Sequence, residues 1–312
     1  MIPTKLCSLL KIKYPIIQGG MAWIADAKLA AAVSNAGGLG LIAAMNSNGE
    51  QLRAEIKAIK KLTKKPYGVN IMLMSPYAKE AAQVVIEEKV PVITTGAGNP
   101  AIYMKDWIAA GIKVLPVVAS TAHARMMAKS GATAVIAEGS EAGGHVGELS
   151  TMALLPQVVD CVDIPVVAAG GIADGRQAAA TFVMGAQGLQ IGTRFLVAKE
   201  CGIHENYKKR VLMARDIDSI ITGKRLGHPV RSIKSPFSRK MFEFEYDNTV
   251  SNEELEKKFG GCLRLAAVDG DEENGCFMAG QVAAMVKAEQ TAAEIIKDIM
   301  DGAEQAIINY KL

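Results

Sequence analysis

The chain has 312 residues and a mass of 33.1 kDa, which is long enough to bury a large core and to form one α/β domain with an appendage. Half of the residues are hydrophobic but only 5% are aromatic, a balance typical of a parallel sheet packed closely against helices. The net charge of +3 is too small to indicate a nucleic-acid partner.

The five cysteines are scattered and form no Cys-x-x-Cys pair. This spacing argues against a disulfide framework or a zinc site and favours a reducing compartment. No apolar run approaches the roughly 20 residues that a membrane-spanning helix requires, and the N-terminus lacks the long apolar stretch of a secretory signal. We therefore expect a cytoplasmic protein without membrane association.

Short apolar runs recur along the first two thirds of the chain, and each is followed by a helical pattern. Strands are predicted to begin near Tyr14, Gly38, Pro66, Val90, Lys113, Ala134, Ile164 and Gly188. The helices between them are predicted over 26–35, 49–63, 77–88, 100–109, 121–129, 151–161 and 174–184. The strand spacing of roughly 20 to 30 residues matches one strand-plus-helix unit.

Eight such units without a break predict a (β/α)8 TIM barrel over residues 1–198. An open doubly wound sheet is the alternative, because a sequence does not show whether a sheet closes. The barrel is favoured because the polar residues and the glycines follow the strand ends, and a barrel gathers those ends at one mouth.

After the eighth strand the periodicity stops. Residues 199–275 are polar and charged and predict a small helical cap or lid, and residues 276–312 predict a helix, over about 278–310, that returns to the barrel. Within the cap, residues 199–240 carry 11 Lys or Arg against 4 Asp or Glu. This imbalance indicates either a solvated, salt-bridged surface or a basic face that steers an acidic partner.

Two glycine-rich turns follow the seventh and eighth predicted strands. They contain Gly170 and Gly171, and then Gly192 and Thr193. Many barrels build a phosphate site at these two places from backbone N–H groups. We therefore predict that these four residues bind a phosphorylated cofactor.

Other strand ends carry candidate ligand contacts. The turn after the first strand holds Gly20, Met21 and Ala22, where paired glycines let the backbone approach a flat ring. Three polar side chains, Asn70, Glu138 and Gln190, lie in or at the end of apolar strands. A buried polar group must find a hydrogen-bond partner, which is either neighbouring backbone or a ligand.

His145 is the candidate catalytic residue. It follows Gly143 and Gly144 in a loop that leaves a buried strand, and imidazole exchanges a proton near neutral pH. Of the other histidines, His123 and His204 are predicted to be structural or surface residues, and His228 is a weaker candidate for the barrel mouth. The chain has no metal-ligand spacing, no Gly-x-Ser-x-Gly elbow, no Walker loop and no Gly-x-Gly-x-x-Gly.

With these residues in view, the chain resembles the nitronate monooxygenase-like flavoprotein barrels, and among them most closely the flavin-dependent enoyl-acyl-carrier-protein reductases of type II. The matching segments are 14–23, 68–73, 94–100, 138–145, 168–173, 190–195 and 278–281, so that the likeness covers essentially the whole chain. Both kinds of enzyme share the glycine loops and the histidine.

The resemblance implies non-covalent FMN, NADH or NADPH as the hydride donor, and support of activity by a monovalent cation whose ligands the sequence does not identify. It places the phosphate on the two glycine turns, the flavin ring near Gly20, Met21, Ala22 and Asn70, and the C-terminal residues Met278, Gly280 and Gln281 over the site. It also implies reduction of an enoyl thioester carried by acyl carrier protein, the last step of the fatty acid elongation cycle. A homodimer is expected for a barrel of this type.

Three alternatives stay open at this point. The first is a nitronate monooxygenase, which reacts with oxygen and needs no nicotinamide. The second is a phosphate-binding lyase or isomerase barrel without flavin, and the third is a flavin-binding module without catalysis.

Overall fold

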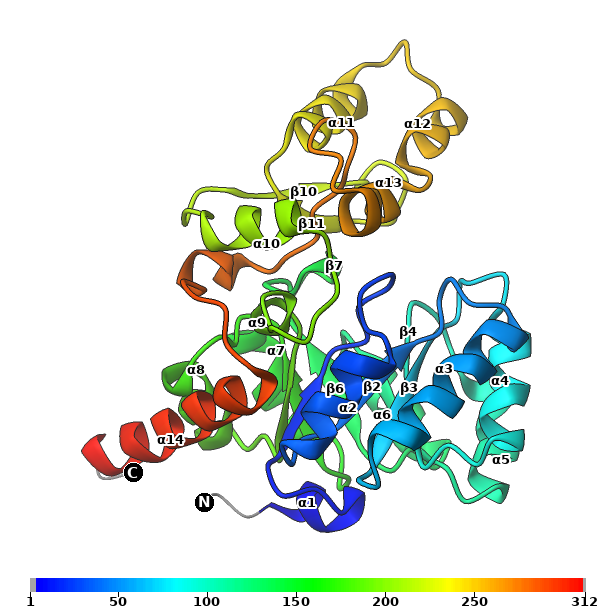
Figure 1. Ribbon diagram of the computed structural model, residues 1–312, viewed down its shortest axis with the longest axis vertical. Coiled ribbons are helices and arrows are strands. Elements are labelled where there is room, and N and C mark those ends of the chain that lie inside the picture. Colours follow the sequence, from blue (N-terminus) through cyan, green and yellow to red (C-terminus); the bar gives the residue numbers. More distant parts are fainter. Residues whose placement is uncertain (1–3, 311–312) are drawn as a thin grey trace.

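The computed structural model describes residues 4–310, and its larger part is a barrel of eight parallel strands surrounded by helices (Figure 1). The strands are β1 (Ile16–Gln18), β2 (Gly40–Ala43), β3 (Tyr67–Met72), β4 (Val92–Gly96), β5 (Lys113–Val118), β6 (Val135–Glu138), β8 (Val166–Ala169) and β9 (Gly188–Ile191). They pair in the order β1-β9-β8-β6-β5-β4-β3-β2. The eight predicted strands and the barrel are thereby confirmed.

The barrel closes where β1 meets β2. A parallel bridge joins Ile17 to Leu39, and the Gln18 N–H donates to the Leu39 carbonyl at 2.9 Å. The buried side chain of Gln18 extends this seam, because its Oε1 accepts from the Leu41 N–H at 3.1 Å. An open sheet would leave these groups unpaired, so the alternative architecture is wrong.

The helices that cover the barrel are α2 (Ala27–Asn35), α3 (Gly49–Leu62), α4 (Ala78–Glu87), α5 (Ala101–Ala109), α6 (Thr121–Lys129), α7 (Thr151–Val159) and α8 (Gly175–Val183). Polar N-caps set several of their starts, among them Asp26, Ser120 and Asp174. Each side chain accepts a hydrogen bond from the first turn of its helix. The predicted helix boundaries agree with these to within two residues.

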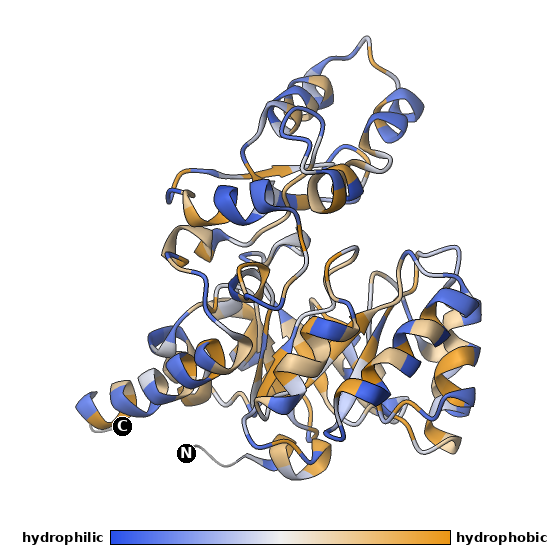
Figure 2. Ribbon diagram, viewed as in Figure 1, coloured by the Kyte–Doolittle hydropathy of each residue, from blue (hydrophilic) through white to orange (hydrophobic). Residues whose placement is uncertain are grey.

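Hydrophobic residues concentrate in the strands and on the helix faces turned toward them (Figure 2). A second buried cluster fills the inside of the barrel and includes Leu6 and Leu10 of α1 (Lys5–Leu10). This short helix, which the sequence did not indicate, closes the end of the barrel opposite the cap. The other end stays open for a site.

The cap rises above the open end of the barrel (Figure 1). Its helices are α10 (Glu205–Leu212), α11 (Pro236–Tyr246), α12 (Asn252–Phe259) and α13 (Cys262–Arg264). It also contains an antiparallel sheet of β10 (Ser219–Thr222), β11 (Val230–Ile233) and β7 (Gly144–His145), which was not predicted. The strand β7 comes from the barrel loop, so this sheet joins the two parts.

The helix predicted over 278–310 is wrong in its first half. After the short α9 (Thr193–Leu196) and the cap, the chain runs extended through Gly280, forms a 3-10 turn at Gln281–Met285, and begins α14 (Ala292–Tyr310) only at Ala292. Hydrogen bonds from the N–H groups of Gly280 and Gln281 to the barrel loops hold this part of the chain across the mouth, with Gly280 extended and the 3-10 turn beginning at Gln281. The α14 helix then packs beside α8 as expected. No helix among residues 4–310 combines the length and the apolar character needed to cross a bilayer.

The seam of the barrel gives a stability prediction. Gln18→Leu keeps the side-chain size but leaves the buried Leu41 N–H without its acceptor, which costs about 1–3 kcal/mol. At about 2–4 °C per kcal/mol, thermal denaturation should show a Tm lower by several degrees. The exposed Gln157→Leu is the control and should change the Tm little. Equal Tm values for the two variants would contradict the role of Gln18.

Candidate functional site

A cavity of about 1050 Å³ lies between the open end of the barrel and the cap. Its wall is formed by the loops that follow the barrel strands, by β7, and by cap residues from α12 to the C-terminal segment. It is lined by fifteen of the sixteen residues that the sequence placed in the site, namely Gly20, Met21, Ala22, Asn70, Glu138, Gly143, Gly144, His145, Gly170, Gly171, Gln190, Gly192, Thr193, Met278 and Gly280.

The first strand end and the third strand touch directly. A Cβ on Gly20 would lie 2.2 Å from the Asn70 side chain, so only glycine fits against this amide. The Asn70 Oδ1 accepts from the Thr94 hydroxyl at 2.8 Å, and its Nδ2 lies 3.5 Å from the Gly20 carbonyl. The protein therefore holds the Asn70 amide in place at the cavity wall, and its weakly bound Nδ2 is available to a ligand.

The two glycine turns form one edge of the cavity. Gly170 and Gly171 have φ values of +90° and +74°, a conformation that L side chains rarely adopt. The Thr151 hydroxyl of α7 fixes the turn by donating to the Gly170 carbonyl at 2.9 Å. Within the described part of the chain, the N–H groups of Gly171 and Thr193 have no acceptor. Free N–H groups at two neighbouring turns that follow strands β8 and β9 suit a phosphate.

Gln190 belongs to β9 and lines the cavity next to the turn that holds Gly192. The side chain is 9% exposed, and its Oε1 has no hydrogen-bond partner among the described residues. A buried amide oxygen without a partner is costly, unless a ligand supplies the donor. The free amide and the free N–H groups therefore fit a phosphorylated ligand with polar ring edges.

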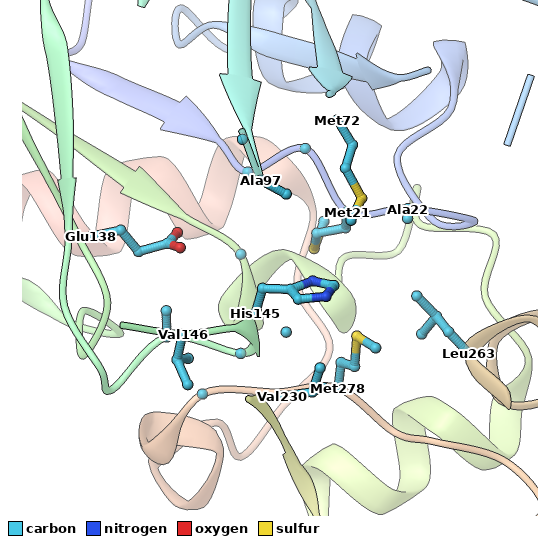
Figure 3. Close-up of a pocket in the computed structure, with 18 of the residues that line it drawn as sticks. Met21, Ala22, Met72, Ala97, Glu138, His145, Val146, Val230, Leu263 and Met278 are labelled. Atoms are coloured by element: carbon cyan, nitrogen blue, oxygen red, sulfur yellow. The ribbon is translucent and has the colours of Figure 1, made fainter. Parts of the chain in front are cut away.

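His145 forms part of the cavity roof. It belongs to β7 and is paired with Val230 of β11, while the next residue, Val146, donates its N–H to the Pro229 carbonyl at 3.0 Å. Figure 3 shows its imidazole projecting into the cavity between Met72 and Met278. The histidine predicted in a loop thus sits on a short strand, whose pairing with the cap fixes its position.

The C-terminal segment closes one side of the site. The Gly280 N–H donates to the Thr193 hydroxyl at 2.9 Å, and the Gln281 N–H donates to the Glu141 carbonyl at 2.9 Å. The exposed side chain of Gln281 does not line the cavity. Gln281 therefore holds the segment through its backbone, and its prediction as a ligand contact is not supported by its position.

The cavity shifts its two central ionisable groups in opposite directions. Burial at the cavity wall disfavours the charged form of the Glu138 carboxyl and raises its pKa to about 7. Burial lowers the pKa of His145, and the neighbouring charge of His228 lowers it further. Near neutral pH, the histidine is therefore mainly neutral and the carboxyl is partly protonated.

Sequence reasoning missed His123 as a residue of the site and gave His228 only as a weaker candidate for the barrel mouth. His228 and His123 both line the cavity, although His123 lies on α6 and was expected to be structural or on the surface. His204 is structural as predicted, since its Nδ1 accepts from the Asn206 N–H at the start of α10. The one available signal for His228 was its position beside the glycine-rich turn that enters β11.

The basic run of the cap does not form one face. Lys208 is buried and paired with Glu289, and the Arg231 guanidinium is buried against the Ser140 carbonyl. Arg210 pairs with Glu272 and stacks on Phe277, whereas Lys209, Lys224 and Arg225 are exposed. Internal contacts therefore engage at least four of the eleven basic residues, since the exposed Arg225 guanidinium also donates to the Asn252 side chain and to the Asp247 and Val250 carbonyls.

The raised pKa of Glu138 predicts how stability depends on pH. The folded protein binds the Glu138 proton more tightly than the unfolded chain does. The stability that this proton contributes is therefore fully present below pH 4.5, and it is lost as the pH rises through about 7. In ligand-free protein, the Tm of Glu138→Gln minus the Tm of wild type should therefore increase between pH 5 and pH 8. A constant Tm difference over this range would show that the carboxyl does not titrate as described.

Three comparisons place the chain among known proteins. The family model described as nitronate monooxygenase matches residues 3–302. A probable nitronate monooxygenase of Staphylococcus saprophyticus is 33% identical, and the match covers 97% of this chain and 98% of that protein.

Two solved structures share the whole architecture. FabK from Thermotoga maritima has a TM-score of 0.97 and 46% identity, covering 100% of this chain and 99% of FabK. A nitroalkane oxidase from Streptomyces ansochromogenes has a TM-score of 0.86 and 28% identity, covering 97% and 99% of the two chains. The chain therefore belongs to the nitronate monooxygenase family of flavin-dependent oxidoreductases.

Proposed function

We propose that the protein reduces trans-2-enoyl thioesters with NADH or NADPH, using FMN, as an enoyl-acyl-carrier-protein reductase. The observation that carries this proposal is the fixed imidazole of His145 above a cavity that continues into the apolar cap. The 46% identity to FabK, against 28% to the nitroalkane oxidase, supports the same choice.

The residues of the barrel mouth fit FMN. The N–H groups of Gly171 and Thr193 would hold its phosphate, and the unpartnered Gln190 amide and Asn70 would bind the polar edge of its ring. Bound flavin would supply the redox chemistry, taking a hydride from NADH or NADPH and delivering it to Cβ of the enoyl thioester.

The cap provides room for an acyl chain. Its part of the cavity wall is mainly apolar and comprises Leu226, Val230, Phe259, Leu263, Cys276 and Met278. An extended hydrocarbon bound there gains roughly 0.8 kcal/mol for each buried CH₂ group. The thioester would then lie below His145, at the junction of the cap and the barrel.

His145 would act on the thioester oxygen. As the enoyl group receives a hydride at Cβ, negative charge develops on that oxygen, and Cα then takes a proton from the imidazole N–H or from water. The lowered pKa of His145 favours the neutral imidazole, which donates its N–H to the oxygen and stabilises the charge. Its position on β7 keeps this donor in place before substrate arrives.

Acyl carrier protein is the proposed carrier of the substrate, and the exposed Lys209, Lys224 and Arg225 are candidate contacts for its acidic surface. Equal KM values for carrier-linked and coenzyme A-linked substrate would argue against this partner. We retain the cytoplasm as the compartment and a homodimer as the assembly within this proposal.

The reaction can be tested in two anaerobic steps. FMN-loaded protein should lose its flavin absorbance on addition of NADH or NADPH, and should regain it on addition of crotonyl-coenzyme A. A protein that both nicotinamides leave oxidised, but that a nitronate reduces, would instead be a nitronate monooxygenase. The family description and the staphylococcal relatives make that reaction the second candidate.

His145→Ala separates the role of the imidazole from flavin binding. We expect flavin to stay bound, and reoxidation by crotonyl-coenzyme A to slow by about 10²–10³-fold in stopped-flow measurements. Reduction by NADH should change only a few-fold. His204→Ala, a histidine outside the cavity, is the control. An unchanged rate of reoxidation in His145→Ala would remove this residue from the mechanism.

A further inference from the structure

The wall of the cavity carries one arginine, whose guanidinium is paired with a carboxylate. Among the described residues that line the cavity, Arg264 is the one lysine or arginine, whereas three glutamates, Glu138, Glu141 and Glu256, share the wall. The proposed substrates both bring phosphate: a nicotinamide dinucleotide has a diphosphate, and a thioester carrier has a phosphopantetheine chain. An incoming phosphate therefore meets one guanidinium at this wall.

Arg264 is held in position from both parts of the molecule. It ends α13 of the cap, and its Nη1 pairs with the Asp269 carboxylate at 2.7 Å. Its guanidinium carbon lies 6.0 Å from the ring centre of Trp23, which belongs to the barrel. Arg264 and Trp23 thus span the gap between the cap and the barrel at the cavity wall. The Nε–H makes no hydrogen bond in the described chain and is free to donate to a ligand.

Trp23 has an unusual backbone and an unusual exposure. Its φ of +64° lies in the left-handed region, which bulky residues rarely adopt. The Ile24 and Ala25 N–H groups both donate to the Met21 carbonyl, and this turn forces the conformation. Of the three other non-glycine residues with positive φ, Lys11 and Lys89 end helices, and Ala97 lies in a loop that lines the cavity, as Trp23 does.

Trp23 differs from those two lysines because it lies in a loop, lines the cavity and leaves its indole 42% exposed. Backbone conformations of this kind persist where the surrounding structure enforces them, and they cluster at ligand clamps. An exposed indole at a cavity wall offers a stacking surface for a planar group.

We propose that Arg264 and Trp23 form a clamp at the cavity wall, in which the guanidinium binds the phosphate of each incoming substrate and the indole stacks on the planar base of the nicotinamide dinucleotide. Asp269 keeps the guanidinium oriented while no substrate is present. This inference rests on the proposed function, because it assigns one rim site to both phosphate-bearing substrates.

Calorimetry of the flavin-loaded protein tests the clamp without turnover. We expect Arg264→Ala to raise the Kd of NAD⁺ and of coenzyme A by about tenfold, since charge-assisted hydrogen bonds to phosphate are lost. Arg264→Lys should recover part of the affinity. The control is Arg215→Ala, which removes an arginine paired with Asp218 away from the cavity. A change for only one ligand would assign the clamp to that ligand, and no change for either would overturn the proposal.

Tryptophan fluorescence tests the stacking. The chain has two tryptophans, and the fully buried Trp107 supplies a constant background. Binding of NAD⁺ should quench the tryptophan fluorescence of the wild-type protein. The Trp23→Phe variant should lose that quenching while it keeps most of its affinity for NAD⁺. Trp23→Ala should lose affinity as well. Quenching that persists in Trp23→Phe would show that the indole does not meet the base.

A donor without phosphate separates failure of the clamp from failure of the proposed function. Reduction of the bound flavin by 1-benzyl-1,4-dihydronicotinamide, followed by reoxidation with the crotonyl thioester of N-acetylcysteamine, needs no phosphate contact. Both rates should be equal in wild type and Arg264→Ala. If wild type completes this cycle but binds neither NAD⁺ nor coenzyme A more tightly than Arg264→Ala, the clamp is wrong and the enoyl reduction stands.

Discussion

The site depends on the pairing of a two-residue strand of the barrel with the cap. Gly144 and His145 lie antiparallel to Arg231 and Val230, and this pairing makes the barrel loop an edge of the cap sheet. It fixes the imidazole in the roof of the cavity and brings the apolar part of the cap over the barrel mouth (Figure 3). Without it, His145 would sit on a free glycine loop. The position of the imidazole and the shape of the cavity therefore both depend on the pairing of β7 with β11.

The cavity also determines the protonation of its side chains. Burial favours the neutral form of both an acid and a base, so it raises the pKa of Glu138 and lowers that of His145. A site with few fixed charges suits a reaction in which charge develops on the substrate, because a neutral donor can respond to it. The charged Arg264 lies at the rim, where the phosphates of the substrates would remain.

The sequence predicted the barrel and most of the site because both follow local rules. Apolar runs at regular spacing mark the strands, and the ends of parallel strands must meet at one mouth, which brings Gly20, Asn70 and Gly170 together. The cap sheet was not predictable, because β7 has two residues and its pairing is long-range. The extended stretch at Gly280 was predicted as helix because the last segment has helical periodicity. Hydrogen bonds to loops distant in the sequence impose the extended conformation.

Both half-reactions of the proposed function require that the barrel mouth binds FMN, with its phosphate on the two glycine turns. The most direct measurement is the visible absorbance spectrum of the purified protein, with the released cofactor identified after denaturation. We predict a yellow protein with about one FMN per chain, as one site of this kind requires. A colourless protein that takes up no FMN on incubation with an excess would show that the barrel mouth does not bind FMN.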